Sequence, residues 1–293
     1  MTLNKKCFLI FIITILLSSC GDNHVKQVFK DEKGNIIEKC EMKNNTRDGI
    51  CEKFYPTGKR SVIEIWKNGI QTDSAVYYDE SGHKMKSESY KNGKINGIVK
   101  FFFKNGMLSD KYFYKGNQRD GLFISYHETG KIKEVGYFNN GLASGNNTYY
   151  NTKGGLTEKR EYVILNNDSK LNQKITYTKN GNVDTVNSNF FKITSISDTV
   201  ELKNDICFDL HFYNPELKSL TIYLGDYNPN FKKIDYSKLK TIRCKNNKYG
   251  TFCYTPTNRG IDTVRGFFDD EGFLNDSTPV VRRYHFDKVI YVK

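Results

Sequence analysis

Residues 96–116 read NGIVKFFFKNGMLSDKYFYKG, and residues 120–141 read DGLFISYHETGKIKEVGYFNNG. The two segments align at an offset of 24 residues, so that Gly106 matches Gly130 and Phe102 matches Tyr126. The same offset continues in both directions through the first half of the chain. An internal repeat of this length is the feature that decides a fold, because each copy forms one structural unit.

The repeat holds three kinds of position in register. Turn glycines recur 24 residues apart at Gly58, Gly82, Gly106, Gly130 and Gly154. Aromatic residues stand four residues before and eight residues after these glycines, at Phe54, Trp66, Tyr78, Tyr90, Phe102, Tyr114, Tyr126, Phe138, Tyr150 and Tyr162. A second series of glycines comprises Gly49, Gly97, Gly121 and Gly145, with Asp73 in the vacant place. Degenerate copies are predicted around Gly34 and Gly181.

Each copy is predicted to form strand, turn, strand and loop. In one copy the strands are residues 98–103 and 108–114, and the turn is 104–106. Glycine suits such turns because positive φ costs it little. A lone hairpin is marginally stable in water, so neighbouring hairpins are expected to stack and share the aromatic positions as a structural ladder. Tyr77, Phe101 and Tyr149 share another slot and are expected to point away from that ladder.

This pattern resembles the bacterial MORN-variant repeat, in which a glycine, an aromatic strand, a tight turn and a second aromatic strand recur. The resemblance covers about residues 25–185 and implies an elongated antiparallel sheet of β-hairpins. Many proteins with such repeats are catalogued as antitoxin components, in the YwqK family. The resemblance therefore also implies an antitoxin or immunity role as one alternative function.

The N-terminus has the layout of a lipoprotein signal peptide. Lys5 and Lys6 precede an apolar run of eleven residues from 7 to 17, which is too short to span a membrane comfortably. Ser18, Ser19 and Cys20 follow this run, and the segment Leu17-Ser18-Ser19-Cys20 resembles the bacterial lipobox. That resemblance implies cleavage after residue 19 and acylation of Cys20, and several acyl chains give a firm membrane anchor.

The 24-residue pattern ends near residue 188, and the residue composition of the chain changes there. Short runs rich in β-branched and aromatic residues follow, such as ICFDLHFY and YHFDKVIYV, separated by Asn, Asp, Gly and Pro. Spacing near ten residues predicts a small β-sandwich, with an Ig-like form as one option. The expected organisation is a signal peptide at 1–19, a repeat domain at 20–187 and a sandwich at 188–293. The fold class is all-β.

Seven cysteines allow disulfides in a secreted protein. Cys40 and Cys51 are expected on adjacent strands of the first repeats, where a disulfide would staple the end of the sheet. In the second half either Cys207–Cys253 links two strands or Cys244–Cys253 closes a hairpin, and one thiol is left over in both cases. No cysteine pair has CxxC spacing and no histidine stands in a ligand pattern, so no metal is predicted.

The chain carries a formal charge of +12, which becomes +10 after residues 1–19 are removed, since that segment contains two lysines and no acid. Such a balance favours acidic partners. Basic and acidic residues alternate along the strands rather than gathering in one block, and the chain is expected to be secreted, so nucleic acid is not an expected partner. Solvated strand faces are the simpler explanation for the lysines.

No residue set predicts catalysis. The chain contains no GxSxG and no HExxH, and its five histidines are isolated. Residues 269–272 read DDEG, but a calcium loop needs more oxygen ligands at alternating positions, so an acidic turn is the favoured interpretation. No cofactor is predicted, and the chain is not expected to be an enzyme.

The leading hypothesis is a membrane-anchored lipoprotein whose repeat sheet binds another protein in the cell envelope. Sheets built from repeats expose long surfaces that suit this purpose. Expected locations are the cell membrane or the outer membrane, facing the periplasm or the cell surface. Besides the antitoxin or immunity alternative, a glycan-binding or anionic-lipid-binding module remains open, through basic faces and outward aromatic rings.

Overall fold

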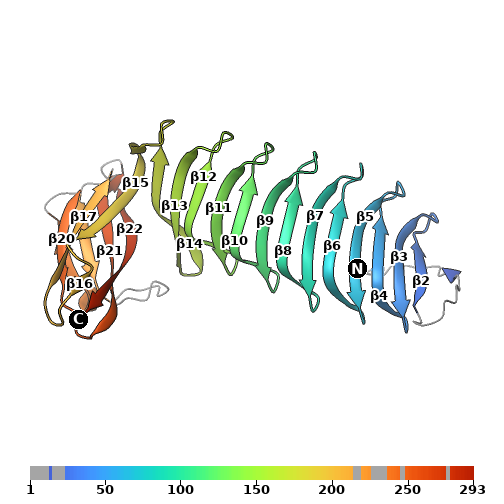
Figure 1. Ribbon diagram of the computed structural model, residues 1–293, viewed down its shortest axis with the longest axis horizontal. Helices are drawn as coiled ribbons and strands as arrows, with labels where there is room; N and C mark the ends of the chain where they lie inside the picture. Colours follow the sequence, from blue (N-terminus) through green and yellow to red (C-terminus); the bar gives the residue numbers. More distant parts are fainter. Residues whose placement is uncertain (1–12, 15–23, 214–218, 226–235, 245–247, 275–277) are drawn as a thin grey trace, which may run out of the picture. The chain divides into compact units, whose positions relative to one another are not determined.

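The computed structural model describes residues 13–14, 24–213, 219–225, 236–244, 248–274 and 278–293 (Figure 1). For residues 13–14, 270–274 and 278–280 it describes the backbone alone. The predicted lipid-anchor residue Cys20 lies outside these residues. The predicted all-β class is confirmed, because the described part of the chain consists of strands, turns and one short 3-10 segment. It holds no helix long and apolar enough to cross a membrane.

The chain divides into two compact units. The first comprises Met1–Lys133 with Phe138–Gly141, and the second comprises Glu134–Tyr137 with Leu142–Lys293. The division passes through strand β11 (Ile132–Asn139). The boundary predicted at residue 188 falls inside β15 (Val183–Ser195).

The first unit is a series of antiparallel hairpins. Each strand from β2 to β10 pairs with its neighbours in the chain (Figure 1). A two-residue strand, β1 (Ile13–Thr14), pairs with β2. The strands are β2 (Val25–Lys30), β3 (Ile36–Lys43), β4 (Thr46–Phe54), β5 (Arg60–Lys67), β6 (Ile70–Tyr78), β7 (Lys84–Lys91), β8 (Lys94–Phe102), β9 (Leu108–Lys115) and β10 (Gln118–Tyr126).

Two kinds of turn alternate along the repeat. At the turn glycines, the amide of Gly106 donates to the carbonyl of Phe103 at 2.9 Å and φ of Gly106 is +84°. The degenerate copies at Gly34 and Gly181 close the same turn. The intervening turns have two residues, as at Asn68-Gly69, where both φ angles are positive. Such turns match the right-handed twist of the strands, and Asn and Gly tolerate them best.

The second glycine series marks a β-bulge in each repeat. Asp73 shares the positive φ of this slot, at +61°, and the pairing register shifts beside it between Glu64 and Ile65. At Gly121 a Cβ atom would lie 3.3 Å from the Cβ of Phe113 on the neighbouring strand. The slot therefore needs a residue that accepts positive φ and leaves room for the side chain opposite.

The second unit begins with more hairpins and continues into a sandwich. Strands β12 to β15 pair in chain order, and the last part of β15 then pairs with β17, which pairs with β20. A second sheet has the order β16-β22-β21-β18-β19. The elements are β12 (Leu142–Tyr150), β13 (Leu156–Leu165), β14 (Asp168–Tyr177), β15, β16 (Thr199–Val200), β17 (Ile206–Tyr213), β18 (Ser219–Leu224), the 3-10 segment η1 (Tyr236–Lys238), β19 (Lys240–Arg243), β20 (Tyr249–Tyr254), β21 (Gly260–Leu274) and β22 (Thr278–Val292).

Aromatic rings fill the space between the two sheets of the sandwich. The ring of Phe212 lies 5.3 Å from that of Phe268 and 4.8 Å from that of Tyr284, and all three side chains are buried. Strand β17 shows why the sequence folds this way, since its exposure alternates strictly and buries Ile206, Phe208, Leu210 and Phe212 on one side. The predicted small sandwich is therefore present.

Two disulfides are formed among the residues that the structure describes. Cys40 is bonded to Cys51 across β3 and β4, and Cys207 is bonded to Cys253 across β17 and β20. Cys244 keeps its thiol. The second bond joins neighbours within one sheet, whereas antibody-type domains place theirs between the sheets.

Candidate binding face

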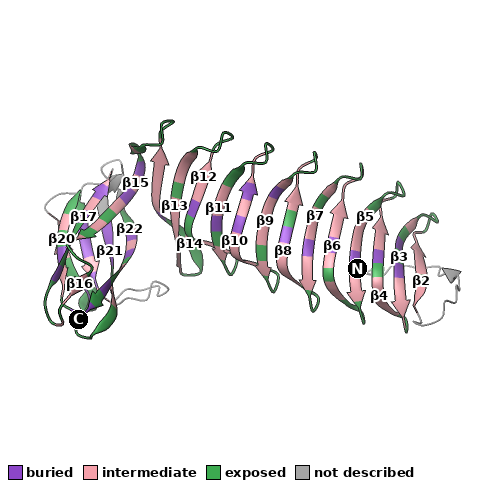
Figure 2. Ribbon diagram, in the orientation of Figure 1, coloured by how far each residue is buried: buried purple, intermediate pink, exposed green. Residues whose placement is uncertain are grey.

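A continuous row of residues, all of them buried except the half-buried Tyr112, crosses the middle of the strands in the first unit. Residues directly opposite each other in antiparallel strands share a face of the sheet. In Figure 2 the buried residues of this unit lie near the strand centres. The row runs through successive pairs from β4 to β10, and we call it the central row: Cys51, Glu64, Ala75, Glu88, Val99, Tyr112 and Phe123.

Glu64 is a buried carboxylate of the central row, with 6 % of its surface exposed. It accepts a hydrogen bond from the Lys53 ammonium at 2.9 Å and another from the Trp66 indole at 3.1 Å. The guanidinium of Arg47 lies over the Trp66 ring, 4.9 Å from its centroid. The predicted ladder position Trp66 is therefore held by a carboxylate on one side and a cation on the other.

Glu88 repeats this arrangement one copy later. It accepts hydrogen bonds from Lys86 at 2.9 Å, from the Tyr77 hydroxyl at 2.8 Å and from the Tyr90 hydroxyl at 2.9 Å. Burial raises the pKa of Glu88, but the donors together outweigh burial and hold that pKa below its ordinary value. Burial and the nearby carboxylate also raise the pKa of Tyr77. The carboxylate is therefore ionised and both hydroxyls are protonated at neutral pH.

Glu88→Ala is expected to lower the free energy of unfolding by roughly 2–4 kcal/mol. The substitution leaves the Lys86 ammonium and the hydroxyls of Tyr77 and Tyr90 without their acceptor at a buried site. Urea unfolding of the full chain measures the change. Because the pKa of Glu88 is lowered from its ordinary value of 4.5, its contribution is present above about pH 4.5 and is lost as the pH falls further. The control is Glu80→Ala in an exposed turn. Equal losses for the two variants would contradict the network.

An aromatic cluster with a central arginine occupies the same face towards β10. The rings of Tyr112 and Phe123 are stacked at 5.6 Å, and Phe138 lies 4.9 Å from Phe123. The Arg119 guanidinium stands 4.1 Å from the Tyr112 centroid and 5.3 Å from that of Phe138, and it donates to the Tyr114 hydroxyl at 3.2 Å.

We call this surface the aromatic–cation face. Its members share the side of the sheet that carries the central row, by direct contact with it or by the alternation of the strands. Beside the central row it comprises Arg47, Trp66, Tyr77, Lys86, Tyr90, Phe101, Tyr114, Arg119 and Phe138. Trp66, Tyr90, Tyr114 and Phe138 are half-buried, so their rings pack against neighbours and still reach solvent.

The structure corrects the predicted facing of Tyr77 and Phe101. Both lie opposite residues of β7 on the Glu88 side, and Tyr77 and Tyr90 donate to the same carboxylate. The aromatic rings of the first unit that pack against one another are Phe101, Tyr112, Phe123 and Phe138, and three of these four lie outside the predicted ladder. The pairing register between strands sets the face, and sequence spacing along a repeat does not reveal it.

The central row could have been found in the sequence. Cys51, Ala75, Val99 and Phe123 are spaced 24 residues apart. The residue type changes at every step, so the slot shows neither the glycine nor the aromatic signal that marks the other repeat positions. Burial is what these residues share, at 0–4 % exposure.

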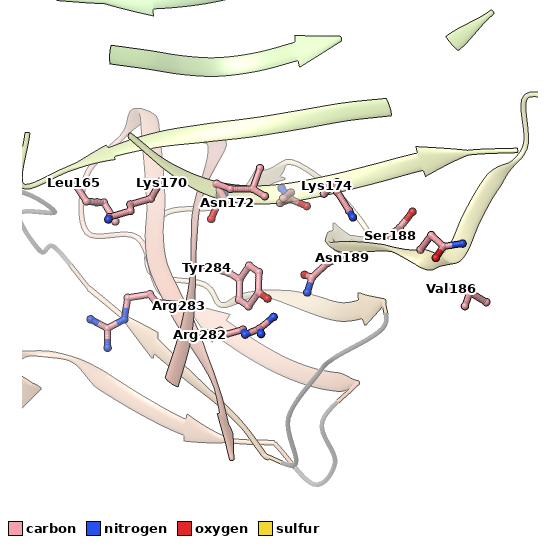
Figure 3. Close-up of a pocket in the computed structure, with 13 residues that line it drawn as sticks. Leu165, Lys170, Asn172, Lys174, Val186, Ser188, Asn189, Arg282, Arg283 and Tyr284 are labelled. Atoms are coloured by element: carbon pink, nitrogen blue, oxygen red, sulfur yellow. The ribbon is translucent and has the colours of Figure 1, made fainter. Parts of the chain in front are cut away.

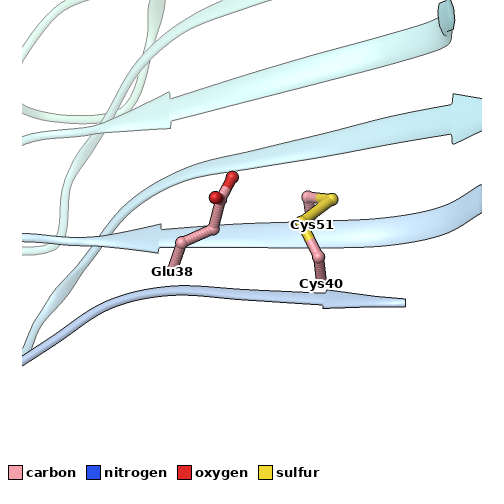
Figure 4. Close-up of side chains that lie close together, drawn as sticks. All are labelled: Glu38, Cys40 and Cys51. Atoms are coloured by element: carbon pink, nitrogen blue, oxygen red, sulfur yellow. A yellow bond between two sulfur atoms is a disulfide. The ribbon is translucent and has the colours of Figure 1, made fainter. Parts of the chain in front are cut away.

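One small cluster has the residue types of a metal site. The side-chain ligand atoms of Glu38, Cys40 and Cys51 lie within 4.8 Å of one another (Figure 4). The two sulfurs are bonded to each other, and metals bind thiolates, so this cluster cannot hold an ion in the oxidised protein. The Glu38 carboxylate also forms an ion pair with the Arg47 guanidinium, with 2.7 Å between the nitrogen and the oxygen.

Residues 269–272 were predicted to form an acidic turn, but they lie in strand β21, where Asp269 is paired with an arginine. Its carboxylate is 3 % exposed and accepts two hydrogen bonds of 2.6 Å from the Arg283 guanidinium. Arg283 also donates to the hydroxyl of Tyr236 at 2.8 Å. The side chains of residues 270–272 lie outside the described part of the chain.

In the second unit an asparagine joins the hairpins to the sandwich. The Asn172 side chain accepts from the backbone amide of His285 at 2.7 Å and donates to the carbonyl of the same residue at 2.9 Å. It also donates to Glu161 at 2.7 Å. The side-chain amide thus links β14 to β22 with the same pair of hydrogen bonds that a backbone unit would make, although Asn172 and His285 are 113 residues apart in the chain.

Lowering the pH from about 6.5 to 4 is expected to destabilise the second unit. Burial, with a smaller contribution from Arg283, lowers the pKa of His285 to about 4. In that window the unfolded chain binds a proton that the folded one does not, so stability falls as pH falls, by about 3 kcal/mol in all. Calorimetry at several pH values measures this, and His285→Gln should flatten the slope. An unchanged slope in the variant would refute the assignment.

The comparisons with known proteins agree with the repeat architecture. The family described as MORN repeat variant matches residues 95–115 and 119–140. These residues include the aromatic cluster around Arg119 and the turns at Gly106 and Gly130. The chain is thus a repeat protein with MORN-type repeats in this segment. No curated protein matches the chain.

Proposed function

We propose that this protein is a non-enzymatic lipoprotein of the cell envelope that binds another protein through the aromatic–cation face. The observation that carries the proposal is the series of cation–ring pairs on that face, formed by Arg47 with Trp66, Lys86 with Tyr77, and Arg119 with Tyr112 and Phe138. Tryptophan, tyrosine and arginine are the residues that contribute most binding energy at protein interfaces.

The packing of this face supports a rigid binding surface. Glu64 and Glu88 hold Trp66 and Tyr90 through hydrogen bonds, so these rings lose little freedom when a partner covers them. The half-buried rings add apolar area, while the exposed edge of Arg47, at 33 % of its side chain, remains available for an acidic group.

The proposed anchor rests on the N-terminal sequence and on the cysteines. The lipobox-like Leu17-Ser18-Ser19-Cys20 follows a signal-peptide core of suitable length. Two disulfides in the described residues favour an oxidising compartment outside the cytoplasm. Metabolic labelling with a fatty acid tests the anchor, since Cys20→Ala should abolish incorporation.

Arg119→Ala is expected to weaken capture of the partner by about tenfold or more, because the guanidinium supports two rings and the Tyr114 hydroxyl. The measurement is quantitative co-purification after crosslinking in intact cells. The matched control is Lys111→Ala, which removes a cation from the opposite face of the same hairpin. Equal capture by both variants, at equal thermal stability, would place the interface elsewhere.

A further inference from the structure

A cavity of about 650 Å³ lies in the second unit between β14, β15 and β22 (Figure 3). Its size is typical of small-ligand sites. Lys170, Asn172 and Lys174 come from β14, and Arg282, Arg283 and Tyr284 come from β22, on the opposite side of the cavity in Figure 3. The two Asn172 bonds to the His285 backbone hold β14 and β22 together, so the walls are in place before any ligand arrives.

The lining of the cavity is positively charged. Four of its residues are cations, and none of its residues is an aspartate or glutamate. The Lys174 ammonium is half-buried and has no hydrogen bond or ion pair with any residue that the structure describes. Lys170 has an ion pair with Asp168, but both side chains are more than half exposed and such pairs are weak. Arg283 is neutralised by Asp269.

Apolar side chains stand beside these cations. Leu171 is 50 % exposed and Val186 is 77 % exposed, and both line the cavity together with Leu165. A bare inorganic anion would gain nothing from them, whereas the C–H face of a sugar ring would cover them. Along β14, Lys170 and Lys174 are four residues apart, which places their backbones roughly 13 Å from each other. A ligand that meets both lysines therefore carries anionic groups at separated positions.

We propose that this cavity binds an anionic oligosaccharide, a sugar chain that bears carboxylate or phosphate groups. Lys174 and Lys170 receive the anionic groups, and Leu171 and Val186 pack against the ring faces. The site lies apart from the aromatic–cation face in the chain and uses none of its residues. An acidic peptide fits the cations less well, because extended side chains would leave the exposed leucine and valine uncovered.

The test is isothermal titration of the full chain with three probes: trigalacturonate, glucose 1,6-bisphosphate and neutral maltotriose. Binding of at least one anionic probe is expected, weakening as salt rises, with no binding of maltotriose. Preference between the two anionic probes distinguishes carboxylate-bearing from phosphate-bearing sugars. Lys174→Gln is expected to weaken binding by about tenfold or more, since it removes a charge-assisted contact.

The matched control is Lys179→Gln, which removes the same charge from the exposed β14–β15 turn, outside the cavity lining. It should leave affinity within about twofold. Failure of both anionic probes to bind, or equal losses in the two variants, would overturn the proposal. Tighter binding of a glutamate-rich peptide than of either sugar would also overturn it. The capture experiment with Arg119→Ala is independent of each of these outcomes.

Discussion

Phe268→Ala is expected to lower the free energy of unfolding of the second unit by about 3–5 kcal/mol. The Phe268 side chain has no exposed surface and lies in the middle of the sandwich core. Its ring centroid lies 4.7 Å from that of Phe191, 5.3 Å from that of Phe212 and 5.2 Å from that of Tyr284. Removing the ring leaves a cavity between two sheets that cannot close without moving both. Calorimetry should show a melting temperature lower by roughly 10 °C.

Tyr291→Ala on β22 serves as the control for this substitution. Tyr291 is 54 % exposed, so its loss removes an aromatic ring from the same sandwich without opening a cavity. We expect a change within about 0.5 kcal/mol. A loss as large as that of Phe268→Ala would mean that the buried rings do not hold the two sheets together.

Replacing Cys207 and Cys253 together by serine is expected to cost about 4 kcal/mol. The bond closes a loop across 46 residues, and its removal returns that loop entropy to the unfolded chain. Reductant should lower the melting temperature of the second unit in the native protein and leave that of the double variant unchanged. No shift on reduction would contradict the expected contribution.

The Cys40–Cys51 bond offers an internal comparison. It spans 11 residues, so the same reasoning gives about 3 kcal/mol for the first unit. The two double variants should therefore rank in the order of their loop lengths. A reversed order would show that packing around the sulfurs, rather than loop entropy, controls the effect.

The sequence determined the repeating hairpin, because that information is local. The glycines at Gly58 and its equivalents mark turns where positive φ is required, and the Asn-Gly pairs mark the two-residue turns between repeats. The one position of the second glycine series without glycine could also be identified from the sequence, because Asp73 stands there and takes the same positive φ. The run ICFDLHFY, rich in β-branched and aromatic residues, likewise indicated a strand, and it forms β17.

Which side chains meet across the sheet was decided only by tertiary structure. The face that a residue takes depends on the pairing register and on the bulges, and a shift of one residue reverses it. This is why Tyr77 and Phe101 lie on the Glu88 side, together with the ladder residue Tyr90, instead of on the face opposite to it. The cluster around Arg119 follows from the same register, since it joins rings from three strands.

The same distinction holds more strongly in the second unit. Asn172 occupies an ordinary position on a hairpin strand, and no local pattern tells that it bonds the backbone of a residue 113 positions away. The lysines of β14 and the arginines of β22 form one cavity only because that contact brings the two strands together. Local chemistry along the chain determines turns and strands, whereas a site built from distant strands exists only once the packing of the whole unit has set their separation.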